Sequence, residues 1–185
     1  MELRPSSLTA IVRTQIALRA LRAKINLLFF ERKYIKMSKH PELIVMLTHN
    51  DRTVENAYEI FDACKDTKAK YWGFKEVGIP LDEMKKLCSY MKACGKTTFL
   101  EVVAYTEEEC LAGAKMAVEC GFDCLMGTIF FDSILDYCKQ HDLRYMPFVG
   151  KITGRPSVLE GTIDGMIEEA NSLLDTFETL DEQAI

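Results

Sequence analysis

Apolar runs and amphipathic helical patterns alternate along the chain from residue 43 to residue 174. The apolar runs begin at intervals of 21–27 residues, which suits one strand, one helix and two short connections. The runs predict strands at Leu43–Leu47, Lys70–Val77, Thr97–Tyr105, Cys124–Phe131 and Arg144–Val149. The patterns between and after them predict helices at Thr53–Cys64, Leu81–Ala93, Glu107–Cys120, Ser133–His141 and Thr162–Leu174. Strict alternation of strand and helix predicts parallel strands in an α/β fold.

Residues suited to helix ends lie at several of these boundaries. Asp51 or Thr53 is expected to cap the first helix, because both side chains accept hydrogen bonds from helix N–H groups. Thr106 precedes three glutamates and predicts a capping box. Gly95 and Gly121 each follow a helix and precede a strand, as glycines at helix C-termini do.

Two architectures fit five such units: an open doubly wound sheet, or the first five units of an eight-stranded barrel. Helices cover both faces of a doubly wound sheet, so its central strands are almost wholly apolar. Here Lys75 interrupts "YWGFKEVG" and Glu101 interrupts "TFLEVVAY". A barrel has an interior where polar side chains at the carboxyl ends of strands form active sites. We therefore favour a partial (β/α)8 TIM barrel with five parallel βα units and an extra N-terminal helix.

The alternation of side chains along the second strand predicts the direction of its lysine. If Lys75 and Tyr71 point inward, Trp72 and Phe74 point outward and pack against helices. The same argument places Glu101 inward on the next strand, within reach of Lys75. Two interpretations are open. The two residues form a buried ion pair in which the charges only neutralise each other, or the pair takes part in catalysis or binding.

Four segments resemble the aldolase-type TIM barrels. They are "MLTHND", "FKEVG", "LEVVAYTEEECLAGAKMAVECGFDCLMGT" and "PFVGKITGRPSVLEGTIDGMIEEA". Within that class they are most similar to the ribulose-phosphate-binding group of epimerases, isomerases, aldolases and synthases. The resemblance spans roughly residues 43–174. Such barrels have eight strands, so we expect a barrel truncated after about five units, or a half-barrel that forms a homo-oligomer if the chain is natural.

The candidate catalytic residues are Lys75, Glu101 and His49. Lys75 could form a Schiff base with a carbonyl substrate, or remain charged and bind an oxyanion or a phosphate. The neighbouring carboxylate of Glu101 favours the charged form. Glu101 is the candidate general base, and His49 is an alternative acid or base at the end of the first strand.

The candidate binding residues lie at strand ends and in the fifth loop. Asn50 and Thr128 follow or end predicted strands, where barrel active sites form. The fifth loop, "GKITGRPSVLEGT", combines free backbone N–H groups with positive charge and suits a phosphate. Its candidate residues are Gly150, Lys151, Gly154, Arg155 and Ser157. The alternative is a surface loop in which proline and glycine only shape a turn.

Charge divides the chain into two predicted domains. The net charge is −5, but residues 1–36 carry eight basic and two acidic side chains. We predict a basic helical extension at residues 1–36 and the partial barrel at residues 37–185. The extension has three interpretations: a targeting presequence, a basic surface helix, or a false start upstream of a natural first residue at Met37.

Composition narrows the environment and the partners. Seven cysteines without a C-x-x-C pair are typical of reduced thiols in a cytoplasmic protein. No apolar run reaches the roughly 18 residues of a membrane span, and the negative charge disfavours nucleic acid. We expect no zinc or other structural metal and no cofactor, although carboxylates at the strand ends leave room for magnesium.

The expected function is an enzyme that acts on a small phosphorylated carbonyl or sugar. Its chemistry would be a lyase or isomerase reaction that begins with proton abstraction alpha to the carbonyl. The alternatives are a metabolite-sensing barrel without catalysis and an inactive fragment of a longer barrel.

Overall fold

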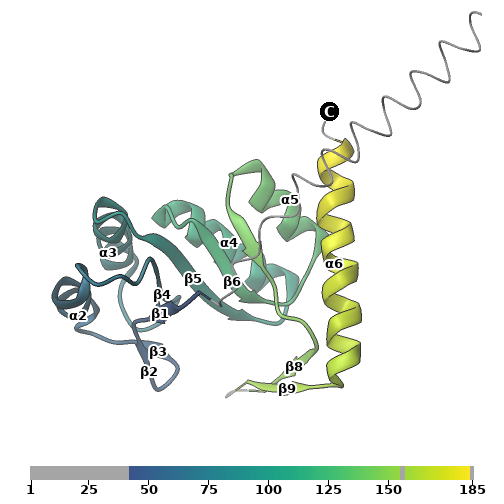
Figure 1. Cartoon of the computed structure of the whole chain (residues 1–185), viewed down its shortest axis with the longest axis horizontal. Coiled ribbons are helices and arrows are strands. Elements are labelled where there is room, and N and C mark those ends of the chain that lie inside the picture. Colours follow the sequence, from purple (N-terminus) through teal and green to yellow (C-terminus); the bar gives the residue numbers. More distant parts are fainter. Residues whose placement is uncertain (1–41, 155–156, 184–185) are drawn as a thin grey trace, which may run out of the picture. The chain divides into compact units, whose positions relative to one another are not determined.

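The computed structural model describes residues 42–154 and 157–183. The basic extension predicted at residues 1–36, and Arg155 in the fifth loop, lie outside these residues. A five-stranded parallel sheet forms in the order β1-β4-β5-β6-β7 (Figure 1). Its strands are β1 (Ile44–Met46), β4 (Tyr71–Lys75), β5 (Thr97–Ala104), β6 (Cys124–Thr128) and β7 (Arg144–Met146).

Helices alternate with these strands, as the sequence predicts. They are α2 (Ala57–Cys64), α3 (Leu81–Ala93), α4 (Glu107–Cys120), α5 (Asp132–Gln140) and the longer α6 (Ile163–Gln183). The prediction of an α/β fold with five parallel strands is therefore confirmed. Sequential strands are neighbours throughout the sheet, and β1 and β7 are its two edges, so the sheet is open and does not close.

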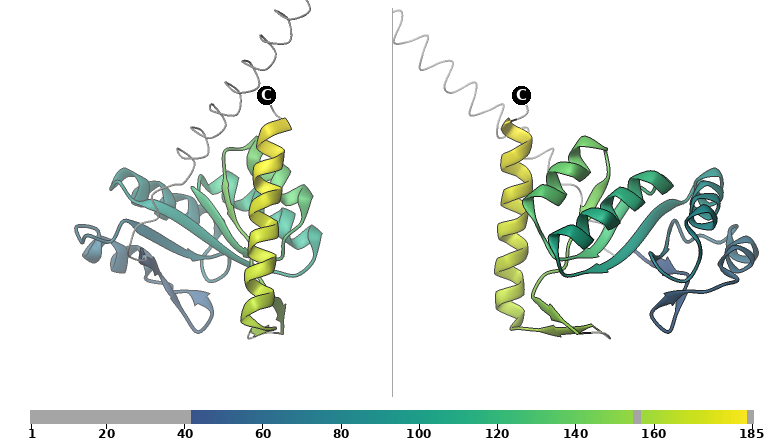
Figure 2. Two further views of the ribbon diagram at one scale, coloured as in Figure 1. Left: turned by 45° about the vertical axis from the view of Figure 1, so that its right-hand side comes forward. Right: turned by 180° about the vertical axis from the view of Figure 1, so that it is seen from behind.

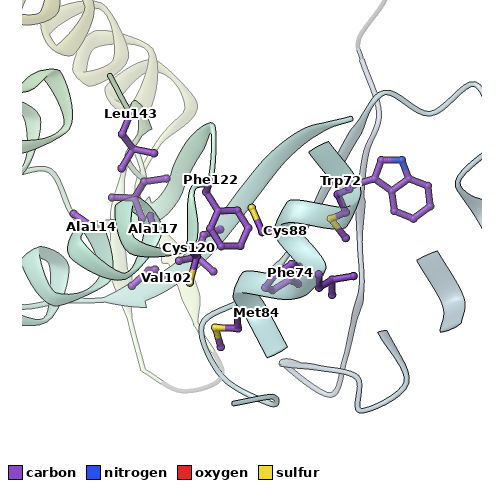
Figure 3. Close-up of a cluster of buried hydrophobic side chains, with 14 of the residues drawn as sticks. Trp72, Phe74, Met84, Cys88, Val102, Ala114, Ala117, Cys120, Phe122 and Leu143 are labelled. Atoms are coloured by element: carbon purple, nitrogen blue, oxygen red, sulfur yellow. The ribbon is translucent and has the colours of Figure 1, made fainter. Parts of the chain in front are cut away.

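The helices α2–α5 pack on one face of the sheet. The strand side chains in the main hydrophobic core alternate along β4 and β5 and include Trp72, Phe74, Leu100 and Val102 (Figure 3). The ring of Phe74 meets the ring of Phe122 edge to face, with 5.0 Å between centroids. A doubly wound sheet would bury both faces under helices. The single covered face agrees instead with a partial barrel.

The other face of the sheet carries the polar residues. Lys75 is in register with Glu101 across the β4–β5 pair, so both side chains lie on the face opposite Trp72 and Phe74. The predicted direction of Lys75 is confirmed.

The segment after β1 differs from the prediction. The predicted connection at residues 48–52 and the first residue of the predicted helix, Thr53, form a hairpin instead, in which β2 (Thr48–His49) pairs antiparallel with β3 (Arg52–Thr53). Asn50 and Asp51 form its two-residue turn with φ of 49° and 60°. Turns of this kind match the twist of the flanking strands, and Asn and Asp tolerate positive φ. The prediction that Asp51 or Thr53 caps the helix is wrong, because α2 begins at Ala57 after Asn56.

The segment after β7 also differs. The fifth strand ends at Met146, three residues before the predicted end. A second hairpin, β8 (Lys151–Thr153) with β9 (Val158–Glu160), precedes α6 and lies beside its first turn (Figure 2). The last helix continues past Leu174 to Gln183.

The helix ends around α4 agree with the sequence. The hydroxyl of Thr106 accepts a hydrogen bond from the Glu109 N–H at 3.3 Å, and Gly121, with φ of 78°, follows the last residue. The N-cap at Thr106 and the glycine after the last residue are confirmed. The Glu109 carboxylate accepts a hydrogen bond from the Tyr105 N–H at 3.5 Å, and the second bond of the capping box stays a prediction.

A polar network joins the amino ends of β5 and β6. The Asp123 carboxylate accepts hydrogen bonds from the Thr98 N–H at 2.8 Å and from its hydroxyl at 2.9 Å. Its other oxygen lies 2.9 Å from the Lys92 ammonium. Burial alone would raise the pKa of Asp123, but the Lys92 ammonium and the Thr98 donors together lower it below the ordinary value.

Replacing Asp123 with asparagine is expected to lower the free energy of unfolding at neutral pH by about 1 kcal/mol, because solvent screens part of the pair. A carboxyl with a lowered folded pKa stabilises above its unfolded pKa, and this contribution disappears as pH falls through the folded pKa. The difference between the Asp123→Asn variant and the unmodified chain should therefore shrink below about pH 4. Urea unfolding across this range measures it, with exposed Asp66→Asn as the control. A difference that stays constant at low pH would contradict the assignment.

Candidate functional site

Lys75 ends β4 and is the centre of the candidate site. Its side chain is only 4% exposed. The ammonium contacts the Asp51 carboxylate and lies 3.8 Å from the Glu101 carboxylate. The contact predicted between Lys75 and Glu101 is confirmed. Asp51 is a second acidic partner, supplied by the β2–β3 turn.

Thr53 fixes the base of this hairpin to the backbone of Lys75. Its hydroxyl donates to the Lys75 carbonyl oxygen at 2.8 Å and accepts from the Lys75 N–H at 2.9 Å. The Thr53 N–H also donates to the Val77 carbonyl oxygen at 2.9 Å. The hairpin is therefore attached at Lys75 and at Val77, which brings its turn to the ammonium.

Because Gly78 has no side chain, the backbone of Thr53 can pack directly against it. Its φ is +117°, and a Cβ at Gly78 would lie 2.2 Å from the Thr53 carbonyl oxygen. Gly95 also has a positive φ, of +72°, but a Cβ there would meet nothing within 4 Å.

The free energy of unfolding of Gly78→Ala is expected to be about 1–3 kcal/mol lower than that of Gly95→Ala. Both substitutions strain the backbone, but only the one at Gly78 adds a steric clash. Chemical denaturation of both variants measures the difference. Equal destabilisation would mean that contact between Gly78 and the hairpin is not close in solution.

Glu101 is suited to accept a proton. Burial raises the pKa of its carboxyl, and the Lys75 ammonium offsets part of this shift. The negative charges of Glu76 and Asp51 raise the pKa further. A carboxylate that is costly to keep charged is a stronger base than one in water.

Glu76 adds another carboxylate beside the pair. One of its oxygens accepts a hydrogen bond from the Val103 N–H at 3.3 Å, and the other is buried without a hydrogen-bond partner. Val103 lies where the β5–β6 register shifts, between Glu101 and Ala104. Among the side chains that the structure describes, those of residues 42–154 and 157–177, no three of His, Cys, Asp or Glu converge to hold a metal ion. Magnesium stays a prediction.

The remaining residues predicted for the first and fourth strands lie on the β2–β3 hairpin and at the end of β6. His49 and Asn50 are exposed on the β2–β3 hairpin. Thr128 is buried, and its hydroxyl pairs with the Tyr145 hydroxyl at 2.7 Å. That hydrogen bond engages the group that Thr128 would offer to a substrate.

The fifth loop is a hairpin in which two candidate donors, the Lys151 ammonium and the Gly150 N–H, already contact carboxylates of the same chain. Lys151 lies 3.3 Å from the Glu160 carboxylate across the β8–β9 pair. The Gly150 N–H donates to the Glu169 carboxylate at 2.6 Å. These carboxylates occupy the kind of position that a bound phosphate would take.

Tyr105 links the tip of this hairpin to the sheet. Its hydroxyl donates to the Gly154 carbonyl oxygen at 2.9 Å and lies 2.8 Å from the Ser157 hydroxyl. Since Tyr105 directly follows β5, the tip lies at the carboxyl end of that strand, whereas Glu101 lies within the strand, four residues before Tyr105.

Sequence reasoning missed the roles of Asp51, Thr53 and Glu76. The Asn50-Asp51 pair after a short strand was the available signal for a hairpin, but the same residues also suit a helix cap. Nothing in the sequence signals that Thr53 would bond to the backbone of Lys75.

No protein-family model matches the chain, and no curated protein matches it either. Within the described residues, no helix is long and apolar enough to cross a membrane.

Proposed function

We propose that the chain is an aldolase-type enzyme that removes a proton alpha to the carbonyl of a small phosphorylated compound. This proposal rests on the buried Lys75 ammonium and the Glu101 carboxyl beside it. Burial raises the pKa of the Glu101 carboxyl. Perturbed titratable groups with a specific charge partner are typical of catalytic sites. The resemblance of the sequence to ribulose-phosphate-binding barrels, and the helix-covered open sheet, support the same class.

Each side chain of the pair has a distinct role in this reaction. Glu101 takes the proton from the alpha carbon, and the bonding electrons form an enolate whose negative charge lies on the former carbonyl oxygen. The Lys75 ammonium stabilises this oxygen by a charge-assisted hydrogen bond. Return of the proton to a carbon gives isomerisation or epimerisation. Attack of the enolate carbon on the carbonyl carbon of a second compound, whose oxygen takes up the proton, forms a carbon–carbon bond and is the reverse of the lyase reaction.

Lys75 acts in this proposal as an ammonium and not as a Schiff-base nucleophile. A Schiff base needs a neutral amine. Two carboxylates, those of Asp51 and Glu101, lie against the group as ion-pair partners. Borohydride reduction with a bound carbonyl compound should therefore add no mass at Lys75.

The fifth loop is the proposed phosphate-binding element. Its tip lies at the carboxyl end of β5, the strand that carries Glu101. Phosphate would displace the Glu160 and Glu169 carboxylates from Lys151 and Gly150. Arg155 and Ser157 are the further candidates, and His49 is the alternative proton carrier.

The test incubates the chain with a panel of phosphorylated aldoses and ketoses and uses phosphorus NMR to monitor turnover. The control for each compound is the corresponding alcohol, which lacks the carbonyl. The proposal expects a new phosphorylated product from at least one carbonyl compound and none from the alcohols. Binding without turnover would point to the metabolite-sensing alternative. Absence of both binding and turnover would remove the proposal.

A further inference from the structure

We infer that the Asp51 carboxylate occupies the position at which an anionic oxygen of a ligand binds Lys75, and that the β2–β3 turn must release it before such a ligand binds. This inference rests on the proposed function for the role of Lys75 as an anion-binding group. It adds a residue that controls access to that group, and it concerns binding alone.

Of the two carboxylates beside the Lys75 ammonium, that of Asp51 belongs to the more exposed side chain. The side chain of Lys75 is 4% exposed, that of Glu101 is 26% exposed and that of Asp51 is 61% exposed. An incoming anion therefore meets Asp51 before it reaches the ammonium. The Asp51 side chain lies between the solvent and the positive charge.

The hairpin can move at its turn while its base stays attached. Thr53 holds the base through two hydrogen bonds to Lys75 and one to Val77. The residues from His49 to Arg52 are exposed, and Asp51 contacts the rest of the site through its carboxylate. Rotation of this side chain out of the site breaks one ion pair and none of the bonds that hold the hairpin.

The charges around Lys75 make the exchange necessary. Asp51 and Glu101 lie against one ammonium, and the charge of Glu76 acts on Glu101, so an additional anion would be repelled if these carboxylates kept their places and charge. If Asp51 leaves, a carboxylate, phosphate or enolate oxygen forms the same kind of charge-assisted hydrogen bond with Lys75. The ligand thus replaces an internal anion with an external one at little cost in free energy.

Removal of the negative charge at position 51 should therefore tighten anion binding. The Asp51→Asn variant is expected to bind inorganic phosphate about tenfold more tightly than the unmodified chain, since a charge-assisted hydrogen bond contributes about 1.5 kcal/mol. Asp66→Asn removes the same charge from an exposed position away from the site, and should leave the affinity within about twofold.

The experiment is a phosphate titration followed by backbone amide NMR on the full chain. Three variants are compared with the unmodified chain: Asp51→Asn, Asp66→Asn and the double variant Asp51→Asn, Lys75→Met. The double variant should lose the gain in affinity, and the shifted amides should surround Lys75. Because Asp51 is exposed, its single variant should keep the fold, so the main comparison survives even if the double variant unfolds.

Two results would overturn the inference: equal affinity of the unmodified chain and Asp51→Asn, or tighter binding whose shifts centre on Lys151 and the fifth loop. The latter would assign the anion to the fifth loop. If Asp51→Asn binds phosphate more tightly but no carbonyl compound is turned over, the proposed function fails and the site at Lys75 stands. If turnover occurs but Asp51→Asn has no effect on affinity, only the present inference fails.

Discussion

Replacing Lys75 with methionine is expected to lower kcat by about 10²–10³-fold, because the enolate oxygen loses its positively charged donor. Methionine is unbranched and apolar and fits the buried end of β4. KM should change less than kcat, since the charge on the oxygen develops mainly in the transition state. Steady-state kinetics on the phosphorylated carbonyl compound found in the panel measure both constants.

The matched control for this variant is Lys86→Met, which changes an exposed lysine on α3. It removes the same charge from the chain and should keep kcat within about twofold. A Lys75→Met variant that folds and retains full kcat would show that the ammonium does not stabilise the transition state. A rise in KM alone would limit Lys75 to substrate binding.

Replacing Glu101 with glutamine is expected to lower kcat by about 10²–10⁴-fold, because the amide cannot accept the proton from the alpha carbon. The side chains are nearly the same size, so the geometry around Lys75 should be preserved. Glu119→Gln on α4 is a suitable control for a general effect of lost charge.

The pH dependence gives a second readout of Glu101. The base must be deprotonated, so the rate of the unmodified chain should fall as pH decreases through the pKa of Glu101. Because burial raises that pKa, this limb should lie above the pH at which a solvent-exposed glutamate titrates, about 4.3. The limb should be absent from the residual activity of Glu101→Gln. A limb that persists in this variant would assign the titration to another group, with His49 the first candidate.

The Glu101→Gln variant is expected to lose activity without losing stability. A carboxyl whose folded pKa is raised is favoured on folding in its protonated form. The free-energy cost of keeping it charged is absent below the unfolded pKa and grows as pH rises through the folded pKa. Glu101→Gln should therefore be at least as stable as the unmodified chain at neutral pH.

Hydrophobic periodicity was sufficient to predict the sheet. Each predicted strand contains an observed one, and the alternation of Trp72 and Phe74 with Lys75 correctly separated the covered face from the polar face. This succeeds because burial against helices is decided by side chains at period two, which a sequence shows directly. The contact between Lys75 and Glu101 follows from that phase and from the pairing of consecutive parallel strands.

Both hairpins escaped prediction because their residues also fit other local structures. The segment from Thr48 to Thr53 has the residues of a helix cap, and only the pairing across a two-residue turn distinguishes the hairpin. The fifth loop has the glycines of an anion site, but Glu169, on α6, meets its Gly150 N–H. Contacts between residues distant in sequence decide such cases, and local propensity does not report them.

The central claim is that Glu101 and Lys75 together remove a proton alpha to a carbonyl. The most direct measurement is incorporation of solvent deuterium at that carbon, followed by NMR on a phosphorylated carbonyl compound in deuterium oxide. The account predicts exchange by the unmodified chain and little exchange by either Glu101→Gln or Lys75→Met. Exchange by the unmodified chain that both folded variants retain would contradict it, as would the absence of exchange from a compound that the chain binds.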